Sequence, residues 1–181
     1  MFEKLLEKIA IELANAGVPY MVIGGQAVLL YGEPRTTRDI DITLGCGLEG
    51  LSTILEVISR LTLTPLVREL ESFVKETMVL PVADESTGIR VDFIFSFTPY
   101  ERQAIARATA VRIGTAEVRF AALEDVVIHK IFAGRDRDLE DVRTILLKNP
   151  RYDREYIEKW LGLFDRTLGK GLLNTFQKIA G

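Results

Sequence analysis

The sequence predicts a mixed α/β fold of the α+β kind: a core with a mixed β-sheet flanked by helices, followed by a C-terminal helical segment. Strand-like runs are concentrated in the first two-thirds of the chain, helical patterns separate them, and from Leu123 onward the pattern is helical throughout. We expect a core at residues 1–122 and a C-terminal helical segment, packed on that core, at residues 123–181.

The N-terminal third alternates between helical and strand-like patterns, separated by glycine and proline. It predicts, in order, a helix over residues 2–14, a strand over 20–23, a turn at Gly24-Gly25, a buried helix over 26–31, a strand over 39–43 and a helix over 48–61.

The middle of the chain predicts two antiparallel pairs of strands around one helix, while residues 66–76 show no clear pattern. The expected elements are strands over 77–82 and 89–95, a helix over 98–108 that Thr98 caps, and short strands over 110–113 and 117–120. The helical C-terminal segment is predicted to break at Gly134, Asn149-Pro150 and Gly162.

The composition excludes several classes of protein. A net charge of -3 provides no global basic field, so a nucleic-acid partner would need a local patch. The single cysteine, Cys46, excludes an internal disulfide framework, and the single histidine, His129, disfavours a histidine-built zinc site or a Ser-His-Asp triad. Because no run of about 18 apolar residues occurs and the first residues are charged, we expect a soluble cytoplasmic protein with no membrane partner.

Two alternating aspartates form the most informative feature of the chain. Residues two apart on a strand project from the same face, so Asp39 and Asp41 would present two carboxylates together. Two neighbouring anions repel each other and favour a shared cation, and oxygen ligands suit Mg²⁺ or Mn²⁺. Asp92, in the otherwise apolar residues 91–95, is the candidate for a third ligand, which would allow two metal ions.

A double glycine precedes these aspartates. Gly24 and Gly25 would let the backbone approach a phosphate group, with the N–H groups of the following helix pointing at it. The alternative is that the glycines only make a tight turn and that Asp39 and Asp41 form the solvent side of an edge strand. The glycines, the aspartate pair and the later aspartate together favour the phosphate site.

These residues resemble the nucleotidyltransferase superfamily that includes DNA polymerase beta, whose signature is an apolar residue before Gly-Gly or Gly-Ser, then Asp-x-Asp, and a third Asp on a later strand. The closer resemblance is to the AbiEii-like branch of abortive-infection toxins, in which Arg-x-Thr-x-Asp-Ile-Asp precedes Lys-x-x-Ala and Arg-Asp motifs. The chain carries such motifs at residues 35–41 and 130–138. The resemblance covers roughly residues 18–148 and implies a mixed-sheet nucleotidyltransferase core.

The resemblance also implies roles for individual residues. Asp39, Asp41 and Asp92 would bind metal, and the glycine turn would hold the triphosphate of an NTP. Lys130 would contact nucleotide phosphates, and its alternative is a surface lysine whose ammonium reaches solvent. Asp138 would match a late catalytic aspartate, and its alternative is a helix cap.

Basic residues lie beside both motifs. Arg35, Thr37 and Arg38 come just before the aspartate pair, where the guanidinium groups would reach substrate phosphates or form salt bridges within the loop. Arg135 and Arg137 would extend a basic patch toward nucleic acid, although the acidic residues between them favour a solvated, ion-paired helix.

The expected function is a Mg²⁺-dependent nucleotidyltransferase that moves a nucleoside monophosphate from an NTP to a hydroxyl group of RNA or protein, as a component of a toxin–antitoxin pair. Asp92 is the expected general base, with Asp138 as the other candidate. One alternative is transfer to a small, aminoglycoside-like molecule. Another is a non-catalytic nucleotide-binding module that acts through a toxin or antitoxin partner.

Overall fold

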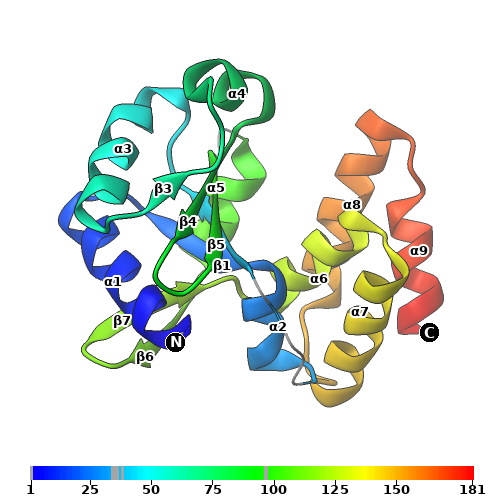
Figure 1. Cartoon of the computed structure of the whole chain (residues 1–181). Coiled ribbons are helices and arrows are strands. Elements are labelled where there is room, and N and C mark those ends of the chain that lie inside the picture. The colour runs from blue at the N-terminus through cyan, green and yellow to red at the C-terminus, as the bar shows by residue number, and fades with distance from the viewer. Residues whose placement is uncertain (1, 34–36, 38, 96–97) are drawn as a thin grey trace. The chain divides into compact units, whose positions relative to one another are not determined.

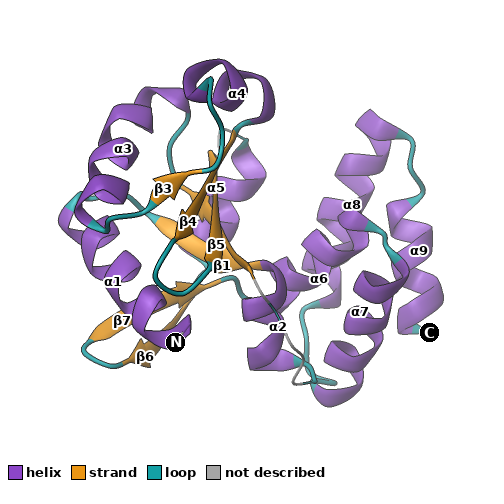
Figure 2. Ribbon diagram, in the orientation of Figure 1, coloured by secondary structure: helices purple, strands orange, loops and turns teal. Residues whose placement is uncertain are grey.

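The structure is a computed structural model of the 181-residue chain, and it describes residues 2–33, 37, 39–95 and 98–181. Figures 1 and 2 show its helices and strands. In chain order these are α1 (Phe2–Asn15), β1 (Tyr20–Ile23), α2 (Gly24–Tyr31), β2 (Asp39–Leu44), the short 3₁₀ helix η1 (Leu48–Gly50), α3 (Leu51–Arg60), β3 (Thr64–Pro65), α4 (Leu70–Thr77), β4 (Val79–Asp84), β5 (Ile89–Phe95), α5 (Pro99–Ala106), β6 (Thr109–Ile113), β7 (Ala116–Phe120), α6 (Leu123–Ala133), α7 (Asp136–Lys148), α8 (Arg154–Leu168) and α9 (Leu172–Ala180).

The chain forms two compact units, and the division between them falls within α2. The sheet unit consists of Met1–Gln26 and Thr37–Ala121. The helical unit consists of Ala27–Thr36 and Ala122–Gly181. A segment from the first fifth of the chain therefore belongs with the C-terminal helices.

The sheet unit confirms the predicted mixed sheet. Its seven described strands lie in the order β3-β4-β5-β2-β1-β7-β6. The pairs β2–β5 and β1–β7 are parallel, and the other neighbours are antiparallel. The two predicted hairpins, β4–β5 and β6–β7, are both present.

The two faces of the central strands differ in chemistry. Ile40 and Ile42 of β2 are fully buried, as are Val91 and Phe93 of β5, whereas the residues between them are polar or partly exposed. Figure 1 shows α1 and α3 side by side along one side of the sheet, and both helices bury apolar residues. This period-two alternation gives β2 and β5 one apolar face and one face that carries the aspartates.

The helical unit has its own apolar core. Contacts link α6 to α7, α8 and α9, and link α9 to α7 and α8. The end of α2 is tied to this unit by two hydrogen bonds: Asn149 Nδ2 donates to the carbonyl oxygen of Tyr31 at 2.8 Å, and Lys148 Nζ donates to that of Gly32 at 3.1 Å. Among the described helices, none is long and apolar enough to cross a membrane.

Two expectations about glycines were wrong. Gly24 and Gly25 do not form a separate turn but are the first residues of α2. Gly162 does not break the last helices: it lies inside α8, beside the buried Leu161. The break comes at Gly169, whose φ of 62° gives the left-handed end of α8.

Candidate active site

Strand pairing brings the three predicted aspartates onto one face of the sheet unit. β2 runs parallel to β5, with Asp41 opposite Asp92 and Asp39 opposite Arg90. Residues two apart on a strand share a face, and so do residues that are directly opposite on neighbouring strands. The polar face of β2 and β5 therefore holds three carboxylates and one guanidinium.

Gly24 shapes the space beside Asp41. It follows β1 directly and has a φ of 65°, a conformation that residues with a Cβ rarely adopt. A Cβ at this position would also overlap the carboxylate of Asp41. The positive φ thus favours glycine at position 24, and the Asp41 carboxylate lies against the backbone where α2 begins. The next residue, Gly25, is buried.

Arg90 is the residue of this face that sequence reasoning missed. Its Nε donates a hydrogen bond to Oδ1 of Asp92 at 2.9 Å, and its Nη2 donates to Oδ2 at 3.1 Å. The hydrogen bond with Asp92 and the charges of Asp92, Asp39 and Asp41 raise the pKa of the Arg90 guanidinium, against a smaller opposing effect of burial. The signal was present in the sequence, because period-two alternation over residues 89–95 puts Arg90 and Asp92 on the same face.

The residue types of this face suit a divalent metal ion. Mg²⁺ and Mn²⁺ prefer oxygen ligands, and carboxylates on neighbouring strands supply them. The side chains as they stand are not gathered into such a site: within the described ranges, no three His, Cys, Asp or Glu side chains group closely enough to hold a metal ion. Asp92 instead directs both carboxylate oxygens to Arg90.

Thr37 lies at the entry to β2. Its Oγ1 donates a hydrogen bond to the backbone oxygen of Asp39 at 3.1 Å, which links Thr37 to the first residue of the strand. Arg35 and Arg38, which the sequence also predicted to bind nucleotide, lie outside the described residues.

The helical unit places Lys130 and Asp138 together. Lys130 on α6 is only 6% exposed, and its Nζ lies 2.6 Å from Oδ1 of Asp138 and 3.1 Å from Oδ2 of Asp141, both on α7. Arg135 Nε donates to the other oxygen of Asp138 at 2.6 Å. We call these four residues the α6–α7 charge cluster.

The structure contradicts the two alternative roles, a surface lysine for Lys130 and a helix cap for Asp138. Lys130 is buried, so its ammonium does not reach solvent as a surface lysine would. The N-cap position of α7 is Arg135, and Asp138 lies inside the first turn, so it is not a helix cap. Burial acts to raise the pKa of Asp138, but hydrogen bonds and charge from Arg135 and Lys130 outweigh it and lower that pKa.

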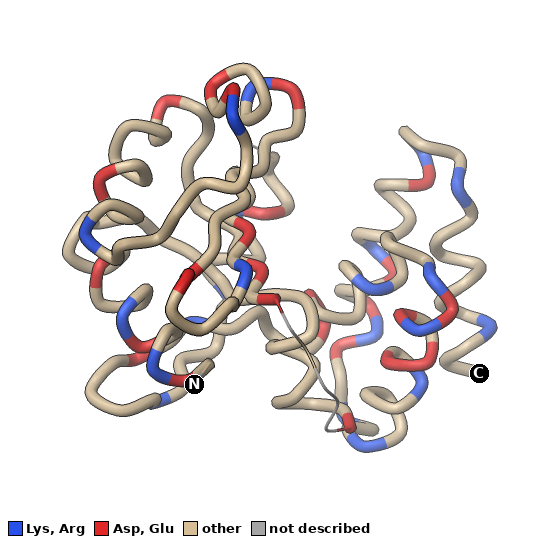
Figure 3. The backbone as a smooth tube through the Cα atoms, in the orientation of Figure 1, with Lys and Arg blue, Asp and Glu red and all other residues tan. Residues whose placement is uncertain are grey.

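The basic residues of α7 are interleaved with acidic ones, as Figure 3 shows along this helix. Arg135 pairs with Asp138, and Arg143 Nη1 lies 2.9 Å from Oε2 of Glu140. This pairing agrees with the expected ion-paired helix. His129 precedes the cluster on α6, and burial, followed by the charge of Lys130, lowers its pKa to about 4.

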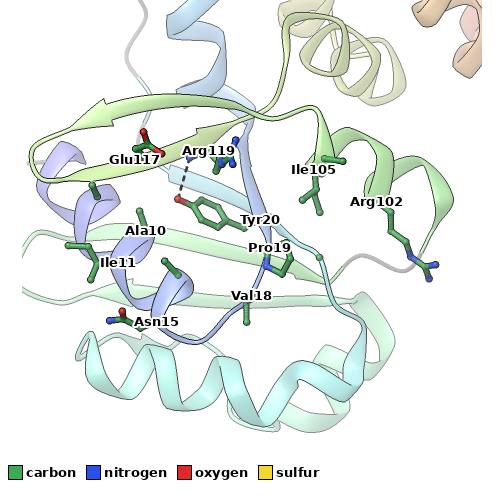
Figure 4. Close-up of a pocket in the computed structure, with 14 residues that line it drawn as sticks. Ala10, Ile11, Asn15, Val18, Pro19, Tyr20, Arg102, Ile105, Glu117 and Arg119 are labelled. Atoms are coloured by element: carbon green, nitrogen blue, oxygen red, sulfur yellow. Dashed lines mark hydrogen bonds between the residues drawn. The ribbon is translucent and has the colours of Figure 1, made fainter.

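A pocket of about 820 Å³ lies elsewhere in the sheet unit, lined by parts of α1, β1, α5 and β7 (Figure 4). In it the hydroxyl of Tyr20 accepts a hydrogen bond from the backbone N–H of Arg119 at 3.3 Å. Tyr20 pairs with Leu44, three positions along β1 from the Ile23–Asp41 pair, so its side chain projects from the opposite face to the aspartates. The pocket and the polar face of β2 and β5 are therefore separate features.

Comparison with known proteins connects the fold to a family. The family model described as "Nucleotidyltransferase of unknown function (DUF6036)" matches residues 2–162. No curated protein matches the sequence.

Several solved structures are similar in fold. The antibiotic-resistance factor ANT(2'')-Ia has a TM-score of 0.63 and 16% identity, covering 92% of this chain and 92% of its own. The lincosamide antibiotic adenylyltransferase LnuA has a TM-score of 0.55 and 16% identity, covering 78% of this chain and 94% of its own. A putative nucleotidyltransferase from Thermotoga maritima has a TM-score of 0.55 and 20% identity, covering 78% of this chain and 90% of its own. At these identities the similarity concerns the fold alone.

Proposed function

The chain belongs to the DUF6036 family of nucleotidyltransferases, and on that premise we propose that it moves a nucleoside monophosphate from an NTP to a hydroxyl group of an acceptor. The observation that carries the proposal is the shared sheet face of Asp39, Asp41 and Asp92, with Gly24 opening the space beside Asp41. In the reaction the hydroxyl oxygen bonds to the α-phosphorus, and pyrophosphate leaves.

We propose that Asp39, Asp41 and Asp92 hold Mg²⁺ or Mn²⁺. The metal would supply a Lewis acid that offsets the negative charge of the triphosphate and of the departing pyrophosphate. Asp92 would take the proton from the attacking hydroxyl, as one of the carboxylates on this face. Asp138 is the other candidate for that role.

The nucleotide would lie against the start of α2. Gly24 and Gly25 lack side chains that would keep a phosphate away, and the free N–H groups at a helix start favour an anion. Arg35, Thr37 and Arg38 would complete the phosphate contacts from the loop before β2.

Lys130 and Asp138 are proposed to act as a pair. For Lys130 to contact a phosphate directly, its ammonium would have to leave two carboxylates at 2.6 and 3.1 Å. A buried pair of this kind is expensive to open. The geometry therefore favours a positioning role over direct contact with a phosphate. In this role Asp138 holds the ammonium group of Lys130 in place.

The acceptor has two candidate classes. RNA or protein follows from the resemblance to the AbiEii-like branch, as does a role within a toxin–antitoxin pair. A small hydroxyl-bearing molecule is supported as strongly, because the structures similar to this chain include ANT(2'')-Ia, solved in complex with adenylyl-2''-tobramycin, and LnuA, solved with lincomycin bound.

A labelling experiment tests the activity and the acceptor together. The protein is incubated with each of the four α-³²P-labelled NTPs, Mg²⁺ and one of three acceptor pools: cell RNA, cell protein or a panel of aminoglycosides and lincosamides. Label that migrates with one pool identifies the acceptor class. Release of labelled nucleotide without a labelled acceptor would mean hydrolysis and would contradict the transfer.

The matched control is the Asp39→Asn/Asp41→Asn variant, which keeps the size of both side chains and removes both charges. We expect it to lose the labelling. Equal labelling by this variant would overturn the assignment of the site. If the wild-type protein binds NTP in calorimetry but labels nothing, the non-catalytic nucleotide-binding module becomes the better account.

A further inference from the structure

The guanidinium of Arg90 lies among the carboxylates that the proposed function assigns to metal. Arg90 is two residues before Asp92 on β5 and directly opposite Asp39 of β2. Its two-point contact engages both oxygens of Asp92, at 2.9 and 3.1 Å. Within the part of the chain that the structure describes, both hydrogen bonds of the Arg90 side chain go to Asp92.

This contact conflicts with metal binding in two ways. A two-point contact fixes the orientation of the Asp92 carboxylate, whereas a metal ion shared with Asp39 and Asp41 needs an oxygen turned toward them. The guanidinium also adds a positive charge beside the ligands, which repels a second cation. Both effects agree with the observation that the described carboxylates do not group closely enough to hold a metal as they stand.

The exposure of Arg90 makes the contact reversible. The Arg90 side chain is 49% exposed and that of Asp92 is 19% exposed, so the guanidinium can leave Asp92 and be solvated by water. Exposed ion pairs contribute little to folding stability. A role for this pair in stability alone would therefore be weak, whereas its position beside the other two aspartates gives it a direct effect on cations.

We propose that Arg90 is a positioning residue that competes with the divalent metal for Asp92, so that metal binding requires the guanidinium to leave the carboxylate. The proposal rests on the proposed function, because it takes Asp39, Asp41 and Asp92 as the metal ligands. Beyond the three aspartates, Arg90 would thus be a fourth residue that affects the metal affinity of the site, and it would lower that affinity.

The test is a titration of the 181-residue chain with Mn²⁺ at low ionic strength, measured by calorimetry and by the electron paramagnetic resonance signal of free Mn²⁺. We expect Arg90→Gln to bind Mn²⁺ about fivefold more tightly than wild type, because one repelling charge and one competing contact are removed. Arg90→Lys keeps the charge but not the two-point contact, and should fall between them.

The matched control is Arg60→Gln. Arg60 is in the same unit, is 53% exposed and pairs with Glu56 at 3.3 Å and with Glu12 at 3.5 Å. Its loss removes a comparable surface ion pair at the end of α3, outside β2 and β5, so the Mn²⁺ affinity should match wild type. A thermal unfolding scan of each variant establishes that the folded protein is being titrated.

A double-substitution cycle isolates Asp92. In an Asp92→Asn background, adding Arg90→Gln should change the Mn²⁺ affinity by only about twofold, because the contested carboxylate is gone and only the repulsion by the Arg90 charge remains. An unchanged or weaker affinity in Arg90→Gln, or a full fivefold effect that persists without Asp92, would overturn the competition.

The two proposals fail in different ways. If Asp39→Asn/Asp41→Asn binds Mn²⁺ as well as wild type does, the metal site itself is misassigned and the proposed function loses its basis. If that variant loses Mn²⁺ binding while Arg90→Gln binds as wild type does, only the competition by Arg90 is wrong.

Discussion

The chain contains two charge clusters that differ in burial. In the sheet unit, the Arg90 side chain beside Asp92 is 49% exposed. In the helical unit, the Lys130 side chain is 7% exposed, and its partner carboxylates on Asp138 and Asp141 are 4% and 12% exposed. A half-exposed pair opens at little cost because water replaces the partner, whereas an opened buried pair leaves charges without solvent. The first cluster is suited to exchanging partners, and the second to holding the helices in place.

The largest expected effect comes from a substitution in the α6–α7 charge cluster. Lys130→Met should lower the free energy of unfolding by about 3–5 kcal/mol, because Asp138 and Asp141 would be left facing an apolar side chain. Urea unfolding followed by circular dichroism measures this change. Lys148→Met is the control: Lys148 pairs with Glu33 at 2.6 Å, but both side chains are exposed, so its loss should cost about 0–1 kcal/mol. Equal losses from the two variants would remove the distinction between the clusters.

The second effect concerns the charged residues on the polar face of β2 and β5, and it should lower the rate of nucleotidyl transfer. Asp41→Asn removes a proposed metal ligand, so nucleotidyl transfer should fall by at least about 100-fold. The unfolding free energy should change by less than about 1 kcal/mol, because replacing one of several neighbouring anions also relieves repulsion. Labelled-NTP assays and urea unfolding give the two values. A large loss of stability with full activity would reverse the roles assigned to the two clusters.

The third effect is a dependence of the unfolding free energy on pH, which His129 beside the α6–α7 charge cluster should cause. The folded-state pKa of His129, beside Lys130, is about 4, compared with 6.5 for an unperturbed histidine. Above pH 6.5 the contribution of His129 to stability is fully present. As pH falls toward 4, the unfolded chain takes up a proton that the folded chain does not, and stability is lost. Between pH 7 and pH 5 the unfolding free energy should fall by about 2 kcal/mol.

The control for this prediction is His129→Gln, which has no ionisable group. Its unfolding free energy, measured in urea at the same pH values, should fall by about 2 kcal/mol less than that of wild type over this interval. Parallel curves for the two proteins would mean that His129 is protonated equally well in the folded chain.

The smallest effect concerns the glycine beside Asp41. Gly24→Ala should lower the unfolding free energy by about 1–2 kcal/mol, because of the positive φ, and should displace the Asp41 carboxylate and reduce transfer. Gly162→Ala is the matched substitution inside α8, where the nearest atom to the new Cβ is 3.8 Å away, and it should stabilise by about 0.5–1 kcal/mol. A gain in stability of the same size in both variants would mean that helix propensity, and not the positive φ of Gly24, decides the effect at that position.

Local patterns in the sequence were enough to place the aspartates. Alternation predicted that Asp39 and Asp41 share a strand face, and the apolar run around Asp92 predicted a second strand. Their meeting depends on β2 and β5 being parallel neighbours, which follows from the arrangement of the whole sheet and not from either segment. Arg90 follows the same alternation, so its position on the face of Asp92 could also have been predicted.

The helical unit was harder to predict, for a physical reason. A lysine inside an apolar helix indicated a partner, but Asp138 and Asp141 belong to another helix, and the packing of α6 against α7 decides which acidic residues face Lys130. The glycine errors have a similar cause. Burial of Leu161 keeps α8 continuous through Gly162, because tertiary packing outweighs the low helix propensity of glycine.

The composition of the helical unit has a consequence for how the protein is made. Residues 27–36 emerge from the ribosome well before α7, which supplies the Asn149 and Lys148 contacts to Tyr31 and Gly32. Ala27 and Val28 are fully or almost fully buried in the folded protein, so they stay exposed in the nascent chain until α7 has been synthesised. The apolar stretch is therefore exposed to chaperones and to aggregation throughout that interval, and a fragment that begins at residue 122 would lack it.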